Sequence, residues 1–170
     1  MFLGNDFDSK IELSKLILED EVQKGKTIGF GIYHKNIERR GKIIELLCYI
    51  CTCDPMFSTS VHFYSKNSHV LFFVYSSDIH DSYESLRPFI LDPNFTKNGS
   101  LLTIINIVQN VNNTPDSNGI KIANQIGARY FLLENDDLPN FRNELLDIIL
   151  CSDEIIWIFF FFSVIKNFIY

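Results

Sequence analysis

The stretch H-V-L-F-F-V-Y-S (residues 69–76) decides the fold, because it is a short run that is apolar on both faces. Such a run is typical of a strand buried inside a parallel sheet. Two further runs of this kind follow, L-L-T-I-I-N-I-V (101–108) and R-Y-F-L-L (129–133). Together the three runs predict a buried parallel sheet.

Segments with helical periodicity separate these strands. Helices are expected over residues 10–22, 82–91, 119–126 and 140–150. Before the first buried strand, F-G-I-Y-H-K-N-I-E and G-K-I-I-E-L-L-C-Y-I flank R-R-G-K, where Gly41 suits the turn of a β-hairpin. Strands that alternate with helices predict a doubly wound α/β fold with right-handed crossovers. In such folds, ligands bind at the carboxyl ends of the strands.

Length and composition fit a single globular domain. The chain has 170 residues, of which 46% are hydrophobic and 21% charged. The formal charge of -6 argues against nucleic acid as a partner, because a protein with an excess of negative charge does not displace the counterions of a polyanion. The start M-F-L-G-N-D-F-D lacks the pattern of a signal peptide, so we expect a cytoplasmic protein whose four cysteines are reduced.

The stretch T-I-G-F-G-I-Y-H-K-N-I-E-R-R-G-K-I-I-E-L (27–46) resembles the switch I and hairpin region of Rab-type small GTPases of the Ras superfamily. That region of the family reads T-I-G-V-D-F-x-x-K-x-I, a short turn and G-K-x-I-K-L. The likeness continues through the 69–76 strand and D-S-Y-E-S-L (81–86), and covers roughly residues 4–150.

The resemblance implies a P-loop GTPase-like (Ras-like) α/β fold: a mostly parallel sheet with helices on both faces. Its first strand is truncated, with only M-F-L (1–3) ahead of the phosphate loop. We expect residues 1–150 to form the Rab-like domain and residues 151–170 to be an atypical hydrophobic tail.

The resemblance implies a site for GTP or GDP with Mg²⁺, but its motifs are degenerate. The phosphate loop G-x-x-x-x-G-K-[ST] is represented by G-N-D-F-D-S-K-I (4–11), in which Ile11 replaces the Mg²⁺-binding hydroxyl. The guanine motif N-K-x-D is represented by N-V-N-N (110–113), which has an amide in place of the carboxylate. The implied vestigial nucleotide site consists of Gly4, Lys10, Thr27, Asn110 and Asn113, with Thr27 as the vestigial Mg²⁺ contact.

The stretch L-L-C-Y-I-C-T-C-D-P-M-F (46–57) holds three of the four cysteines. A zinc site needs four ligands and usually a second pair, so drift is the better interpretation. In the family the equivalent of residues 49–55 reads W-D-T-A-G-Q-E. Ile50 therefore replaces a magnesium-side Asp, Cys53 a Gly whose amide contacts the γ-phosphate, and Asp54 the Gln that orients water. With these groups missing we expect no hydrolysis, and no catalytic residue is assigned.

The resemblance also implies a surface for Rab effectors or regulators. Ile32, Tyr49 and Tyr64 match the hydrophobic triad through which Rab proteins meet effectors. The full set of implied effector-binding residues is Ile28, Gly29, Phe30, Ile32, Tyr49, Phe57 and Tyr64. The alternative is that these side chains only pack the hairpin.

The tail I-I-W-I-F-F-F-F-S-V-I-K-N-F-I-Y ends without the prenylation cysteines of the family. Its apolar run over 155–165 is shorter than the roughly 20 residues of a membrane span. Three readings stay open: a shallow anchor that gives peripheral attachment to endomembranes, the end of a helix, or sequence that is not native coding sequence.

These features favour a Rab-like homologue in intracellular vesicle trafficking that acts as a pseudo-GTPase. Such a protein would be a binding module with weak or no GTP binding. Two alternatives remain: a functional Rab protein that binds and hydrolyses GTP, and a truncated fragment without a function.

Overall fold

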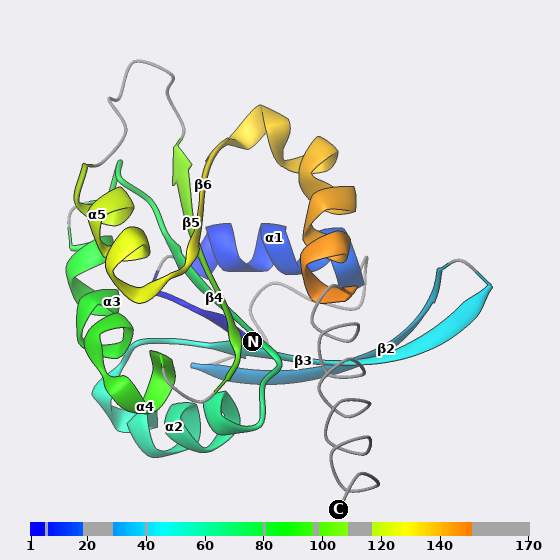
Figure 1. Cartoon of the computed structure of the whole chain (residues 1–170), viewed down its shortest axis with the longest axis horizontal. Helices are drawn as coiled ribbons and strands as arrows, with labels where there is room; N and C mark the ends of the chain where they lie inside the picture. The colour runs from blue at the N-terminus through cyan, green and yellow to red at the C-terminus, as the bar shows by residue number, and fades with distance from the viewer. Residues whose placement is uncertain are drawn as a thin grey trace, which may run out of the picture.

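The computed structural model describes residues 1–5, 7–18, 29–39, 41–79, 81–96, 99–108 and 117–150. These residues form a six-stranded sheet of order β2-β3-β1-β4-β5-β6 (Figure 1). Its strands are β1 Phe2–Leu3, β2 Phe30–Arg39, β3 Lys42–Cys51, β4 Val70–Tyr75, β5 Leu101–Val108 and β6 Arg129–Glu134. Only β2 and β3 pair antiparallel, so the prediction of a mostly parallel sheet is confirmed.

Helices cover both faces of the sheet, as expected (Figure 1). They are α1 Phe7–Leu18, α2 Ser58–Lys66, α3 Ser82–Leu91, α4 Pro93–Thr96, α5 Ser117–Ile126 and a last helix over 138–150. The first core lies under α1 and the 138–150 helix, and it includes Ile17, Ile50 and Phe141. The second core lies under α2, α3, α4 and α5, and it includes Val61, Leu86 and Ala123.

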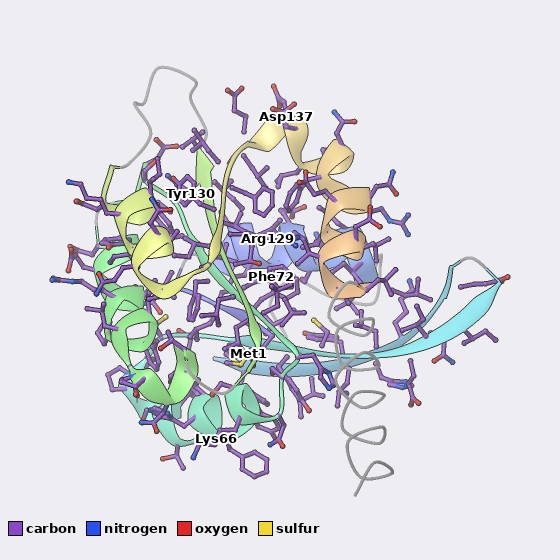
Figure 2. The ribbon with its side chains drawn as sticks, in the orientation of Figure 1. Met1, Lys66, Phe72, Arg129, Tyr130 and Asp137 are labelled. Atoms are coloured by element: carbon purple, nitrogen blue, oxygen red, sulfur yellow. The ribbon has the colours of Figure 1, made fainter. Side chains whose placement is uncertain are left out.

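The short strand β1 occupies the centre of the sheet. It pairs with β3 on one side, where Phe2 faces Ile50, and with β4 on the other, where Phe2 faces Phe72. The rings of Phe2 and Phe72 stack with centroids 4.8 Å apart. Phe72 lies near the middle of the molecule (Figure 2). Two residues therefore join the two halves of the sheet.

Most of the predicted elements are confirmed. The helix over 82–91 and the strand over 101–108 have the expected bounds, and Gly41 takes a positive φ of 72° at the hairpin turn. Helices α2 and α4 were not predicted. The sequence of α2, S-T-S-V-H-F-Y-S-K, is rich in residues of low helix propensity, and its buried Val61 and Ser65 hold it against the sheet. The expectations for residues 19–22 and for the tail lie outside the described residues.

Strands β2 and β3 form a long hairpin that projects from the sheet (Figure 1). Along it, successive side chains alternate between the two sides. Tyr33, Ile37 and Leu46 pack against the first core, whereas Ile32 and Leu47 point the other way and are each 50% exposed. One side of the hairpin is thus covered, and the other faces solvent over much of its length.

Candidate functional site

Of the predicted nucleotide residues, the structure describes Gly4 and Lys10, at the carboxyl end of β1. Gly4 is tightly constrained, because a Cβ there would lie 2.0 Å from the carbonyl oxygen of Val74 in β4. The Gly4 amide donates a hydrogen bond to the Cys51 carbonyl at 3.3 Å. This position therefore requires glycine for the close passage of β1 past β4, whether or not a phosphate binds.

Lys10 is turned into the protein. Its side chain is 2% exposed, and its Nζ donates to the Cys51 carbonyl at the end of β3 over 2.6 Å. A buried ammonium needs such a partner, because removal from water disfavours the charge. The lysine that resembles a phosphate contact therefore links α1 to β3 through a hydrogen bond. The other predicted nucleotide residues, Thr27, Asn110 and Asn113, lie outside the described residues, as does the effector residue Ile28.

Asn5 is a site residue that the sequence analysis missed. Its Oδ1 accepts a hydrogen bond from the Thr52 hydroxyl at 3.0 Å and a second from the Cys53 amide at 2.9 Å. The loop after β1 is thereby joined to the loop after β3. No local spacing could signal this contact, since its partners lie 47 and 48 positions away along the chain.

Two residues at degenerate positions have structural roles instead. The Asp54 carboxylate accepts from the Met56 amide at 2.8 Å and so caps η2, the 3-10 turn Pro55–Phe57. Ile50 is 1% exposed and belongs to the first core. Asp54 therefore binds the backbone of the following turn, and Ile50 packs in the core.

Cys48, Cys51 and Cys53 are all buried and reduced. Burial raises the pKa of Cys48 to about 11 and the pKa values of Cys51 and Cys53 to about 12. The charge of Lys10 lowers the pKa of Cys51 and Cys53, but by less than burial raises it. These thiols stay protonated at neutral pH and are poor nucleophiles. Across the described parts of the chain, no three His, Cys, Asp or Glu residues are grouped as metal ligands.

A cluster of stacked rings lies where β2, β3 and α2 meet. The ring centroids of Phe30 and Tyr64 are 4.6 Å apart, and those of Tyr49 and Tyr64 are also 4.6 Å apart. Phe63 meets Tyr64 edge-on at 5.1 Å and is itself 62% exposed. Ile32 lies opposite Tyr49 in the hairpin register.

We call the surface formed by Phe30, Ile32, Leu47, Tyr49, Phe63 and Tyr64 the aromatic face. It continues the second core outward, because its three half-buried rings pack against that core. Beyond it on the hairpin, the exposed His34 and Glu45 side chains pair over 2.6 Å. The structure therefore brings the predicted triad together with Phe30, which the resemblance also implied, and adds Leu47 and Phe63.

Gly29 and Phe57 connect the aromatic face to the loop after β3. Gly29 has a φ of 78°, and a Cβ there would lie 2.2 Å from the Phe57 ring. The Gly29 carbonyl also accepts from the Thr52 amide at 2.8 Å. Because glycine alone tolerates both the torsion and the contact, the ring of Phe57 can close over the start of β2.

An open cleft of about 810 Å³ lies beside these loops, between α2 and α3. His62 of α2 and Asp92 after α3 approach each other across it, with Nε2 and Oδ2 3.8 Å apart. The Asp92 carboxylate is also bonded to the Asn94 amide at 2.8 Å. The lining of the cleft is more apolar than polar, and two of its ionisable side chains, His62 and Asp92, face each other.

No model of a protein family and no curated protein matches this chain. Within the described residues, no helix has the length and apolar character required to cross a membrane. The Rab resemblance therefore rests on the quoted motifs, and the strand order of the sheet is compatible with it.

Proposed function

We propose that this chain is a Rab-like pseudo-GTPase that acts in intracellular vesicle trafficking by binding Rab effectors or regulators. The aromatic face carries this proposal. Exposed apolar patches of this kind mark interaction sites, and aromatic side chains supply much of the energy of protein interfaces. Phe30 stacks on Tyr64, and the tilted ring of Tyr49 also contacts Tyr64, so a partner would find an ordered surface.

We call the region at the carboxyl ends of β1 and β3, around Asn5, Lys10 and Cys53, the nucleotide edge. Its groups support weak or absent nucleotide binding. The Lys10 ammonium donates to a backbone carbonyl, and the Cys53 amide donates to Asn5. Asp54 adds a negative charge next to the same loop. A triphosphate would have to displace these internal bonds and tolerate the carboxylate, which lowers its net binding energy.

The proposed setting is the cytoplasm, with peripheral attachment to endomembranes. The family resemblance supports this proposal, and a partner protein would bring the chain to the membrane.

Binding to purified Rab effectors and regulators tests the aromatic face. We expect Leu47→Ala and Tyr64→Ala each to lower the affinity for such a partner about tenfold or more, because both residues are large apolar side chains of the aromatic face. Leu132→Ala on β6 is the matched control, since Leu132 is 39% exposed and belongs to the opposite edge of the sheet. Equal affinity of Leu47→Ala, Tyr64→Ala and Leu132→Ala for such a partner would reject the aromatic face as its binding site.

A titration with fluorescent GTP and GDP in the presence of Mg²⁺ tests the nucleotide part of the proposal. We expect no saturable binding in the micromolar range. Micromolar or tighter binding would instead support the alternative of a functional GTP-binding Rab protein, and a hydrolysis assay would then show whether the chain turns GTP over.

A further inference from the structure

The Asn5 side chain lies at the carboxyl ends of two neighbouring parallel strands, β1 and β3. In α/β sheets this edge is where ligands bind, and backbone amides there commonly donate to oxygen atoms of the ligand. Here the donors are the Cys53 amide and the Thr52 hydroxyl, and one oxygen, Asn5 Oδ1, accepts from both.

We propose that Asn5 is a positioning residue that acts as an internal substitute for a ligand oxygen. Its backbone is anchored, because the preceding Gly4 amide donates to the Cys51 carbonyl and Gly4 lies against Val74 of β4. The side chain therefore extends from a fixed point, and its two acceptor contacts hold Thr52 and Cys53 in one arrangement. We call this contact the Asn5 clamp.

The clamp continues into η2 through a series of hydrogen bonds. The Thr52 hydroxyl accepts from the Asp54 amide at 3.4 Å, and the Asp54 carboxylate accepts from the Met56 amide at 2.8 Å. The Phe57 amide then donates to the Asp54 carbonyl at 2.9 Å. This series of hydrogen bonds connects Asn5 with the segment from Thr52 to Phe57.

The far end of this segment is the aromatic face. Phe57 packs on Gly29 at the start of β2, and α2 begins with the next residue and carries Tyr64. The clamp therefore holds the α2 half of the aromatic face against the hairpin half without any nucleotide. That consequence for partner binding rests on the proposed function, whereas the clamp itself does not.

Nuclear magnetic resonance on the full chain observes the clamp directly. A hydrogen bond from Cys53 N–H to Asn5 Oδ1 gives a scalar coupling between the Cys53 amide nitrogen and the Asn5 side-chain carbonyl carbon. We expect this coupling in the wild-type protein, and we expect it to persist when GTP or GDP is added with Mg²⁺. Its absence, or its loss on addition of nucleotide, would overturn the inference.

Amide hydrogen exchange in variants measures what the clamp does. Asn5→Ala removes the acceptor, so exchange at Cys53 and at the η2 amides should become about fivefold faster, as expected for the loss of one hydrogen bond. Asn5→Asp keeps an acceptor oxygen at the same position and should stay within about twofold of wild type. Asn36→Ala, at an exposed asparagine of β2, is the matched control and should leave these amides unchanged.

The outcomes separate this inference from the proposed function. Exchange at Cys53 in a folded Asn5→Ala protein at the wild-type rate would overturn the clamp, and so would equal acceleration in Asn5→Asp. If Asn5→Ala does not fold, the scalar coupling in the wild-type protein decides. None of these readouts involves a partner, so failure of the aromatic-face variants to affect partner binding would count against the proposed function alone.

Discussion

The nucleotide edge and the aromatic face lie at the two ends of one short segment, residues 51–57. They differ in how far their side chains are engaged by contacts inside the protein. At the edge, Asn5 and Lys10 use their polar atoms on the Cys53 amide and the Cys51 carbonyl. At the face, apolar side chains such as Leu47 and Phe63 remain 50% and 62% exposed.

This difference indicates which region is available for binding. A hydrogen-bonding group that already has an internal partner gains little from a ligand, because one bond is exchanged for another. An exposed apolar side chain has no such competitor, and its burial by a partner is favourable in proportion to the area removed from water. The hydrogen bonds of Asn5 and Lys10 therefore stabilise the fold, whereas the aromatic face presents apolar area to solvent.

The contact of Gly29 with Phe57 joins the two regions, and breaking it should have the largest effect. We expect Gly29→Ala to lower the free energy of unfolding by about 3 kcal/mol, because the new Cβ meets both a positive φ and the Phe57 ring. Gly41→Ala has a similar φ and no neighbour within 4 Å, so it should cost about 1 kcal/mol. Urea unfolding measures both, and equal losses would show that the ring contact adds nothing.

Alkaline pH should lower the free energy of unfolding, because the cysteine thiols are buried in the fold. The pKa of Cys53 is about 12 in the fold against an ordinary value of 9.0, so the unfolded chain loses this proton first as the pH rises. Stability is therefore unaffected by this group below pH 9 and falls between pH 9 and 12, by about 1.4 kcal/mol per pH unit.

Urea unfolding between pH 8 and 11 tests this slope in the wild-type protein and in Cys53→Ala. The variant should show a slope shallower by about 1.4 kcal/mol per pH unit above pH 9, and the same slope as wild type below it. Parallel curves over the whole range would mean that the Cys53 thiol is accessible to water in the fold.

Lys10→Met tests whether the edge needs its ammonium. We expect the free energy of unfolding to change by no more than about 1 kcal/mol, because loss of the bond to the Cys51 carbonyl offsets relief from burying a charge. Lys15→Met on the same helix, at a partly exposed pair with Glu12, is the control and should change stability by less than about 0.5 kcal/mol. A loss above about 3 kcal/mol in Lys10→Met would show that the ammonium holds the edge together.

The smallest effect on stability is expected at the aromatic face. Leu47→Ser should change the free energy of unfolding by less than about 0.5 kcal/mol, since its side chain is half exposed and leaves no cavity. Leu132→Ser on β6 should change the free energy of unfolding by a similarly small amount, as measured by thermal or urea unfolding. A markedly larger loss in Leu47→Ser would indicate that the face is part of the core rather than a surface kept for a partner.

The sheet was predictable, and much of the site was not. Runs such as 69–76 and 101–108 predict buried strands, because a strand covered on both faces must be apolar throughout. Helix α2 was not predicted because its serines and threonine favour other conformations. The packing of Val61 and Tyr64 on the second core offsets that preference. The three clustered rings, Phe30, Tyr49 and Tyr64, all belong to the surface that the family resemblance implies, whereas the resemblance did not point to Leu47 and Phe63.

By itself the sequence determined the α/β order and the hairpin, because each depends on residues that are near one another in the chain. The tertiary structure alone decided the contacts at the carboxyl ends of β1 and β3. Asn5 meets Cys53 across 48 positions, and Lys10 meets Cys51 across 41. Such contacts exist only once parallel strands set β1 beside β3, and side-chain periodicity along a segment carries no information about them.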